Sequence, residues 1–286
     1  MPTIQWYPGH MAKTARILSE NISLVDLVIE ILDARIPLSS QNPDFDKLLN
    51  NRRRLVLFNK EDLADPVVSS MWKEYYADNT ADIIFTDLKT GAGLKTVRTT
   101  LKKIGADKAA KQTSKGVVWR PVRAMVIGIP NSGKSTLINM LAGRASAKTE
   151  DKPGVTRSKQ WIRLSDGIDL LDTPGVLWPK FENDETAENL AFTGAIKDSI
   201  MDSEEIAERL LHRILPFYPE HLATRYGIEG DFSAGETGFT LLNAVAKKRG
   251  FLLKGGDKDL NRAASAVLDE FRAAKIGRIS LERPPM

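Results

Sequence analysis

Residues 128–135 have the composition and spacing of a loop that binds phosphate groups. They read Gly-Ile-Pro-Asn-Ser-Gly-Lys-Ser, which fits G-x-x-x-x-G-K-[ST], and they lie between an apolar run and a helical pattern. Glycines in such a loop let backbone N–H groups turn toward phosphate, and the following helix adds positive potential at its N-terminus. Lys134 is then expected to reach the β- and γ-phosphate oxygens in catalysis, and Ser135 to ligate Mg²⁺. The residues predicted to bind the nucleotide here are Asn131, Ser132, Gly133, Lys134, Ser135 and Thr136.

Two motifs further along the chain carry groups that would complete a phosphate and magnesium site. Asp172-Thr173-Pro174-Gly175 ends an apolar run, which places Asp172 to hold Mg²⁺ through water and the Gly175 N–H to reach a γ-phosphate in binding and catalysis. Between the motifs, residues 153–156 read Pro-Gly-Val-Thr, where a switch loop would give the Thr156 hydroxyl to Mg²⁺ and to catalysis. Alone, Asp-Thr-Pro-Gly is more often a β-turn. The nearby phosphate motif favours the functional interpretation.

Asn59, Lys60 and Asp62 form an Asn-Lys-x-Asp motif that predicts guanine as the base. A carboxylate accepts hydrogen bonds from N1–H and the 2-amino group of guanine, and a site built for those donors rejects adenine, which lacks them. The lysine stem would cover the ring and the asparagine would brace the loop. An isolated motif of this kind reads as a helix-capping loop, but its occurrence with the phosphate motif favours GTP over ATP. The loop at 87–93, with Leu88, is a weaker candidate for covering the base.

The order of the motifs is the reverse of that in ordinary small GTPases, because the base motif at 59 precedes the phosphate motif at 128. Joining the usual ends and cutting elsewhere leaves the sheet intact, since termini commonly lie close together at a domain surface. We therefore predict a circularly permuted P-loop GTPase domain. In that arrangement the Asp172–Gly175 switch leads directly into the segment after the sheet, which gives the nucleotide state a short covalent path to it.

The apolar pattern predicts an α/β fold for the first part of the chain. β-Branched runs separated by helical patterns indicate a mostly parallel sheet with helices on both faces. The polar segment 105–116 is predicted to be either a flexible connection or a basic helix extension. The predicted strands are 25–32, 55–58, 83–85, 124–129, 161–164 and 168–171.

After about Pro179 the pattern becomes helical. Asp202 and Glu205 resemble a capping pair that opens a helix ended by Pro216, and further helices are predicted over 239–249 and from Leu260 to Gly277. We therefore expect two domains. The first is a GTPase domain over 1–180, and the second is a smaller all-helical domain over 181–286.

Composition excludes several classes of site. The chain of 286 residues has no cysteine and three histidines, which excludes a disulfide framework, a zinc ribbon and a thiol nucleophile. Its apolar runs are shorter than the roughly 18 residues of a membrane span, and its start lacks the apolar core of a signal peptide. These features predict a cytoplasmic protein without a membrane partner.

The net charge of +4 conceals a strongly uneven distribution. Residues 95–123 carry nine basic side chains and one acidic one, and residues 247–286 carry ten basic and five acidic ones. Both stretches are candidates for contacting RNA phosphates, with solvated helix faces as the alternative. Residues 182–208 carry nine acidic side chains and one basic one, which predicts a hinge or an intramolecular partner.

With these motifs in this order, the chain resembles the ribosome biogenesis GTPase A family, the circularly permuted GTPases of the YlqF/RbgA type. The resemblance also rests on residues 6–11 (Trp-Tyr-Pro-Gly-His-Met), Asp33-Ala34-Arg35 and Gly277-Arg278-Ile279-Ser280. Tyr7 departs from the frequent phenylalanine, and Asp87-Leu88-Lys89 from a Ser-Ala-Lys-like loop, which leaves the details of base closure open. Permuted relatives that act on the small subunit carry a zinc module with cysteine ligands, which a chain without cysteine lacks.

The resemblance implies a factor that binds and hydrolyses GTP during assembly of the large (50S) ribosomal subunit. Such a factor binds rRNA of the maturing subunit in its GTP state and is released on hydrolysis. It also implies GTP and Mg²⁺ at the site, with no DNA partner, and we expect a monomer away from the ribosome. Asn131 resembles the asparagine that lets some related GTPases bind K⁺ near the phosphates.

The position where many GTPases carry a glutamine that orients the attacking water is Val176 here, so unassisted turnover should be slow. His10 is the catalytic substitute that the resemblance implies, with a structural or rRNA-contacting role as the alternative. His212 and His221 are expected at the surface. Two other functions remain open at this point. One is a nucleotide-gated RNA-binding protein with negligible turnover, and the other is a small-molecule kinase that uses ATP.

Overall fold

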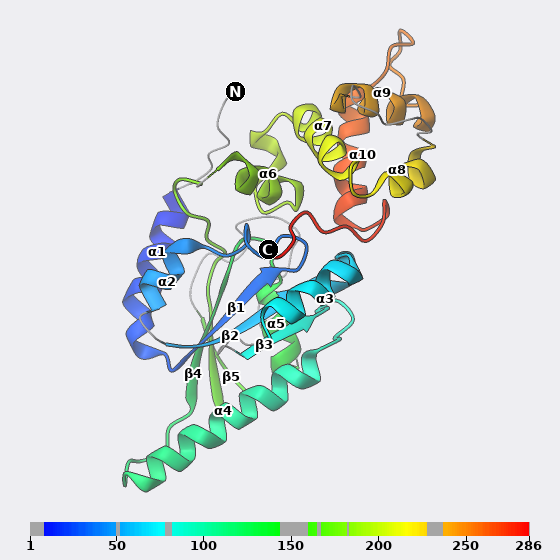
Figure 1. The fold of residues 1–286 in the computed structure, drawn as a ribbon. Helices are drawn as coiled ribbons and strands as arrows, with labels where there is room; N and C mark the ends of the chain where they lie inside the picture. Colours follow the sequence, from blue (N-terminus) through cyan, green and yellow to red (C-terminus); the bar gives the residue numbers. More distant parts are fainter. Residues whose placement is uncertain are drawn as a thin grey trace.

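Among the residues that the structure describes, a six-stranded sheet forms the centre of the α/β part (Figure 1). The computed structural model describes residues 9–49, 52–77, 82–143, 160–164, 167–181, 183–227 and 237–285. The strand order is β3-β2-β1-β4-β6-β5, with β5 antiparallel to β6 and the other neighbours parallel. Each predicted apolar run overlaps a strand, so the mostly parallel α/β sheet is confirmed. The strands are β1 (Leu27–Asp33), β2 (Arg53–Asn59), β3 (Asp82–Thr86), β4 (Val122–Gly128), β5 (Gln160–Arg163) and β6 (Ile168–Asp172).

Helices cover both faces of the sheet, which is why the central strand β1 is buried at every residue. Leu27, Ile29 and Ile31 pack toward α4 (Leu94–Ser114) and α5 (Lys134–Ala142). Val28 and Leu32, which alternate with them, face the other side. The helices on that side are α1 (Gly9–Asn21), α2 (Pro43–Leu49) and α3 (Pro66–Tyr75).

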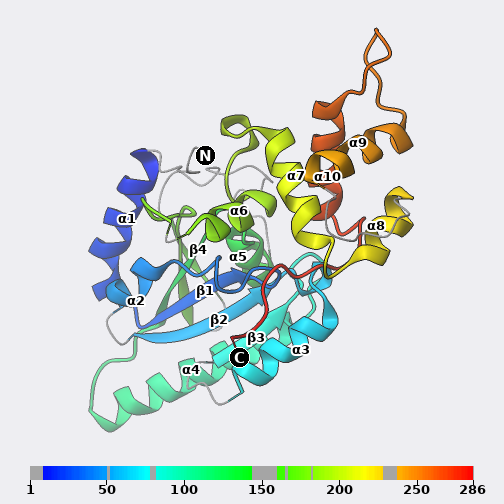
Figure 2. The same cartoon turned by 45° about the horizontal axis from the view of Figure 1, so that its top comes forward.

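The polar segment 105–116 is a helix extension, the second of the two predicted alternatives. It forms the C-terminal half of α4, which continues to Ser114. Alanine and lysine are strong helix formers, so this half is helical even without an apolar stripe. Figures 1 and 2 show that it projects on the side of the molecule away from the C-terminal helices.

The chain after β6 is helical, as predicted. Asp202 accepts hydrogen bonds from the Glu204 and Glu205 N–H groups and so caps α7 (Ser203–Ile214). The prediction that the last helix ends at Gly277 is wrong, because α10 (Leu260–Arg272) ends before Ala274, which has a φ of 53°. Two short helices carried no sequence signal strong enough to be predicted. They are α6 (Asp184–Phe192) and α8 (Pro219–Tyr226), and the other helix of this part is α9 (Gly238–Arg249).

The acidic segment 182–208 forms ion pairs within the helical part, which confirms its role as an intramolecular partner. Arg209 bridges Glu188 on α6 and Glu205 on α7. Arg272 on α10 contacts Asp198 at 2.7 Å. These contacts neutralise part of the negative charge of the segment. No helix among the residues that the structure describes is long and apolar enough to cross a bilayer.

Candidate nucleotide site

The predicted motifs meet at the carboxyl edge of the sheet. Asp33, Asn59, Gly128 and Asp172 are the last residues of four strands that follow one another in the order β2-β1-β4-β6. Between β1 and β4 the strand order reverses, and ligands of open α/β sheets bind at such a switch point. The permuted order of the motifs in the sequence therefore leaves them adjacent in space.

Asn59 joins the base motif to the phosphate loop. Its Nδ2 donates a hydrogen bond of 2.7 Å to the Ser132 carbonyl, and its Oδ1 accepts one of 3.0 Å from the Leu88 N–H. Gly133 lies against this side chain, since a Cβ there would lie 2.3 Å from Asn59 Nδ2. Only glycine fits so close to the Asn59 side chain, and the φ of 109° at residue 133 favours glycine as well. The geometry agrees with the predicted bracing role of Asn59.

Lys60 is held by an acidic residue to which the sequence reasoning gave no role. Its Nζ lies 3.0 Å from Asp33 Oδ2, at the end of the neighbouring strand. Arg35 donates to the same carboxylate through Nε at 2.9 Å and Nη2 at 2.7 Å. Burial by itself would raise the pKa of Asp33, but the two cations outweigh it and hold that pKa far below its usual range. The signal in the sequence was an acid at the end of an apolar strand, followed two residues later by arginine.

Asp62 lies half-buried in the turn after β2, within the 3₁₀ helix η2 (Glu61–Leu63). Burial raises its pKa, and the neighbouring carboxylate of Asp87 adds to the effect. Asp87 in turn organises its own loop by accepting hydrogen bonds from the Lys89 N–H and the Thr90 hydroxyl. The site thus keeps an acceptor near the surface, which matches what guanine recognition requires.

Leu88 is placed differently from what its predicted role suggests. Its side chain is 2% exposed and packs in the core between the sheet and α4. Only its backbone N–H faces the site, where it bonds to Asn59. The Leu88 side chain is therefore not placed to cover a base, and closure of the 87–93 loop over a base stays a prediction.

Lys134 and Asp172 form a buried pair of opposite charge beneath the phosphate loop. Burial lowers the pKa of Lys134 to about 8, with Asp172 opposing the shift. Burial raises the pKa of Asp172 to about 6, with Lys134 opposing it. Lys134 Nζ donates a hydrogen bond of 2.5 Å to the Ile129 carbonyl. Asp172 Oδ1, in contrast, is buried without a hydrogen-bond partner among the described residues. That orphaned oxygen, at the end of β6, fits a hydrated Mg²⁺ ion.

Gly175 packs directly on the phosphate loop. A Cβ at this position would lie 2.7 Å from the Pro130 Cα and 3.0 Å from Lys134 Nζ, so a side chain has no room. The next residue, Val176, donates its N–H to the Gly128 carbonyl at 3.3 Å. Its side chain is buried and apolar, so it has no group that orients water. The switch segment is therefore in contact with the loop that would hold the phosphates.

Asn131 links the phosphate loop to the helical part. It has a φ of 59°, and its Nδ2 donates 2.8 Å to the carbonyl of Gly194, just beyond α6. Arg272 on α10 reaches the same turn through a hydrogen bond of 3.0 Å from Nε to the Phe192 carbonyl. The amide oxygen is the atom that would ligate K⁺, and this role of Asn131 stays a prediction.

The C-terminal strap, residues 277–282, returns across the ends of β1 and β2 toward α3 (Figures 1 and 2). The Ile279 N–H donates 3.1 Å to the Leu63 carbonyl, and Arg278 Nε donates 2.8 Å to the Ala64 carbonyl. The Leu281 N–H donates 2.9 Å to the Arg35 carbonyl. Sequence reasoning used this segment only for the resemblance and missed that it supports the turn carrying Asp62. Its partners lie more than two hundred residues away in the chain, beyond the reach of local patterns.

Some predicted residues lie outside what the structure describes. Thr156 belongs to 144–159, which falls outside the described residues. His10 lies in α1, but its side chain is not among those described. Ser132 is buried, and Ser135 and Thr136 are partly exposed in the first turn of α5. His212 is exposed, and His221 packs against the Tyr218 ring with 5.4 Å between centroids.

Known proteins resemble this chain over nearly its whole length. A family model described as "50S ribosome-binding GTPase" matches residues 123–215. Ribosome biogenesis GTPase A of Priestia megaterium is 44% identical over 283 residues, or 99% of this chain and 97% of that protein. The protein of the same name from Thermotoga maritima is 32% identical, over 98% of this chain and 95% of its own.

Two solved structures of YlqF have a similar fold. One, bound to GDP, has a TM-score of 0.64 at 29% identity and covers 94% of this chain and 99% of its own. The other, GNP-bound and from T. maritima, has a TM-score of 0.62 at 29% identity and covers 95% of this chain and 98% of its own. The similarity therefore includes both the sheet and the helical part.

Proposed function

Because the chain belongs to the ribosome biogenesis GTPase A family, we propose that it assists assembly of the large (50S) ribosomal subunit and binds rRNA of the maturing subunit. The chain is a GTPase with a circularly permuted P-loop domain, and it binds guanine nucleotide. The names of its relatives link the chain to ribosome biogenesis. That it acts on the large subunit is the more specific part of the proposal. The description of the matching family model, which names the 50S particle, supports that step.

The observation that carries the proposal is the set of hydrogen bonds through which Asn59 holds the base motif against the phosphate loop. Asp62, which is proposed to bind the base, and Lys134, which is proposed to bind the phosphates, are therefore held in one preorganised site before a nucleotide binds. Preorganised polar groups lower the cost of binding and act most strongly where water is excluded. A carboxylate such as Asp62 matches the donors of guanine, which adenine lacks, and this argues against the kinase alternative, which would use ATP.

We propose the following roles in hydrolysis. Lys134 has a pKa of about 8 and is mostly cationic at neutral pH, so it contacts the β- and γ-phosphate oxygens. Ser135, Thr156 and, through water, Asp172 would hold Mg²⁺, which would neutralise charge on those oxygens. The N–H of Gly175 contacts the γ-phosphate. His10 orients the attacking water in place of a glutamine, and Asn131 would contribute an oxygen to K⁺.

Nucleotide state is proposed to reach the helical part along two paths. The first is covalent, since the switch segment continues through Leu177 and Trp178, which pack with α6 residues such as Leu190. The second is the hydrogen bond from Asn131 to Gly194. We assign 1–180 to the GTPase domain and 181–286 to the helical domain, which contacts rRNA together with the basic stretch 95–123. The protein is proposed to be cytoplasmic and monomeric away from the ribosome.

Turnover of GTP with and without purified large subunits tests this function. We expect slow basal turnover, because Val176 occupies the glutamine position, and a clear increase when subunits and K⁺ are present. A rate that neither subunits nor K⁺ changes would instead favour the nucleotide-gated RNA-binding protein. Small subunits serve as the matched control and should leave the rate at its basal value.

A further inference from the structure

Three large apolar residues stand in solvent at the amino edge of the sheet, opposite the nucleotide site. Val117, Val118 and Trp119 are 53%, 87% and 61% exposed, and they lie shortly before β4, which begins at Val122. Folded proteins expose consecutive apolar side chains of this size mainly where another molecule binds. The proposed nucleotide mechanism gives these three residues no role, so nucleotide binding does not explain why they are exposed.

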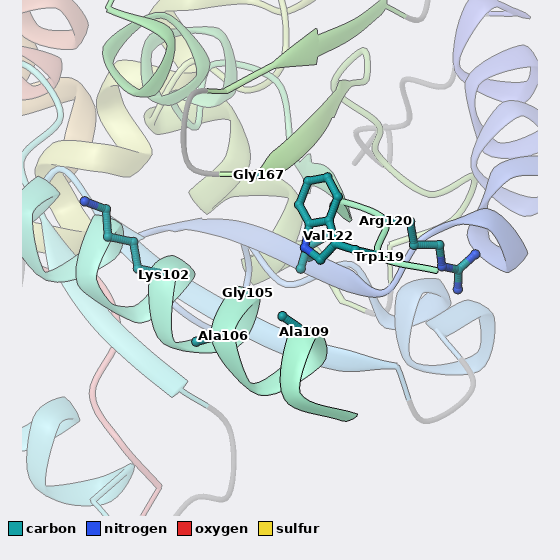
Figure 3. Close-up of a pocket in the computed structure, with 8 residues that line it drawn as sticks. All are labelled: Lys102, Gly105, Ala106, Ala109, Trp119, Arg120, Val122 and Gly167. Carbon is teal, nitrogen blue, oxygen red and sulfur yellow. The ribbon is translucent and has the colours of Figure 1, made fainter. Parts of the chain in front are cut away.

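The Trp119 ring forms one wall of a cavity of about 290 Å³ (Figure 3). The opposite wall is the face of α4 that carries Gly105, Ala106 and Ala109, all too small to fill the space. A Cβ at Gly105 would meet no described atom within 4 Å, which shows that the space above it is open. The cavity is near the lower limit for small-ligand sites and suits one flat ring system.

Hydrogen bonds hold the backbone on both sides of Trp119, and they fix the position of its ring. Gln112, buried in α4, accepts a hydrogen bond of 3.2 Å from the Arg120 N–H through Oε1. Its carbonyl accepts another of 3.0 Å from the Val117 N–H. On the far side, the ring packs against Gly167, where a Cβ would lie 3.2 Å from Cζ2 of Trp119. A preset aromatic wall reduces the entropy cost of stacking a ligand on it.

Positive charge surrounds this cavity. Lys102 and Arg120 line it and project from opposite ends in Figure 3. Two acids reduce the local charge, because Asp26 contacts Lys108 at 2.6 Å and Arg120 at 3.7 Å, and Asp107 contacts Arg53 at 3.7 Å. The stretch 95–123 nevertheless keeps nine bases against one acid. The complementary ligand is therefore anionic as well as flat.

A second exposed tryptophan lies on the edge strand β5, where it pairs with Leu171 of β6 and so sits further along the sheet than Trp119. Trp161 on β5 is 40% exposed, and the Arg123 guanidinium lies 5.5 Å from its ring centroid. Aromatic rings interleaved with cations are the arrangement that binds single-stranded nucleic acid, in which bases stack and the backbone follows the charge. A duplex does not offer its base faces in this way, because they are stacked on one another.

We propose that this cavity binds an unpaired nucleotide of single-stranded RNA, with the base stacked on Trp119 over Gly105 and Ala109 and the flanking phosphates on Lys102 and Arg120. The proposal rests on the proposed function, in which rRNA is the partner, and specifies one contact of that partner. Because the cavity lies at the amino edge, this contact does not depend on whether GDP or a GTP analogue is bound.

Fluorescence anisotropy with the full chain tests the proposal, using a labelled 12-nucleotide single-stranded RNA and a duplex of the same sequence. Trp119→Ala should weaken single-strand binding roughly tenfold and leave duplex binding within twofold, since one stacked base is lost. Trp119→Phe should restore most of the affinity. The matched control is Tyr75→Ala, which removes an exposed aromatic from α3 on the other face of the sheet and should change neither affinity.

Equal losses for single strand and duplex, or unchanged binding by Trp119→Ala, would overturn the proposal. So would a variant that changes self-association of the chain while its RNA affinity stays the same. GDP affinity and GTP turnover with large subunits are measured on the same samples. If subunits fail to stimulate the wild-type chain, the proposed function fails, whereas loss of the stacking effect alone removes only this contact.

Discussion

The carboxyl and amino edges of the sheet present their functional side chains in opposite ways. At the carboxyl edge, Asp33 and Asn59 are 1% and 4% exposed and bonded to neighbouring loops. At the amino edge, Trp119 is 61% exposed beside a cavity. A buried, bonded site discriminates between small ligands, because a wrong ligand leaves polar groups unpaired. An exposed aromatic and basic surface accepts a large, variable partner. Changes at the first edge should therefore be far more damaging than changes at the second.

The largest effect is expected for Asp62→Asn. The substitution removes a carboxylate that accepts from two guanine donors, and losing two such bonds costs roughly 3–6 kcal/mol of nucleotide binding free energy. Competition of unlabelled GDP, XDP and ADP against a fluorescent nucleotide measures it. The variant should prefer XDP, which carries a carbonyl where guanine has its amino group. Retained preference for GDP would show that Asp62 does not read the base.

Asp33→Asn should cause the next largest loss, this time in folding stability. Arg35 is 1% exposed, so without the carboxylate it becomes a buried charge lacking its counter-ion. Such a change costs about 3–5 kcal/mol in the free energy of unfolding, measured with urea. Asp82→Asn, which removes an exposed partner of Arg53, is the control and should cost less than about 1 kcal/mol. Similar losses in both variants would refute the importance of burial at this edge.

The same carboxylate predicts a pH dependence. The pKa of Asp33 is lowered in the fold, so its contribution to stability is present above the pKa of an unfolded aspartate, near 4, and is lost as pH falls below it. The wild-type chain should therefore lose more stability between pH 5 and pH 3 than Asp33→Asn does. Urea unfolding at a series of pH values measures this. Parallel curves for the two proteins would exclude Asp33 as the source.

Arg278→Ala should have a moderate effect at a distance from any ligand. It removes hydrogen bonds from the C-terminal strap to the Ala64 and Glu61 carbonyls, of 2.8 and 2.7 Å, and so loosens the turn that carries Asp62. We expect GDP affinity to fall about fivefold, consistent with roughly 1 kcal/mol for the lost bonds. Lys275→Ala, an exposed neighbour before the strap, is the control. Unchanged GDP affinity would limit the strap to a packing role.

The smallest effect is expected at the amino edge, for Arg120→Gln. Removing one phosphate contact should lower the slope of log affinity for single-stranded RNA against log salt by roughly 0.7. GDP affinity should not change, because the residue lies across the sheet from the nucleotide site. Titrations at several KCl concentrations measure the slope. A change in GDP affinity would show that the two edges are coupled.

The sequence was sufficient for features set by local patterns. The strands follow from β-branched runs, and the phosphate loop and base motif from fixed spacing between chemically specific residues. Contacts between segments far apart in the chain could not be predicted from the sequence. Asp33 acquires its role only when β1 lies beside β2, and the strap acquires its role only when residue 279 meets residue 63. The short helix α6 was missed because nine residues contain too few turns for a clear apolar period.

Binding to large subunits in different nucleotide states joins the nucleotide site to the proposed partner in one measurement. Co-sedimentation with large-subunit precursors is compared with a non-hydrolysable GTP analogue, with GDP and without nucleotide. We expect strong co-sedimentation with the GTP analogue and release with GDP, and the same pattern for Asp62→Asn with the xanthine nucleotides. Equal binding in every state would contradict this expectation.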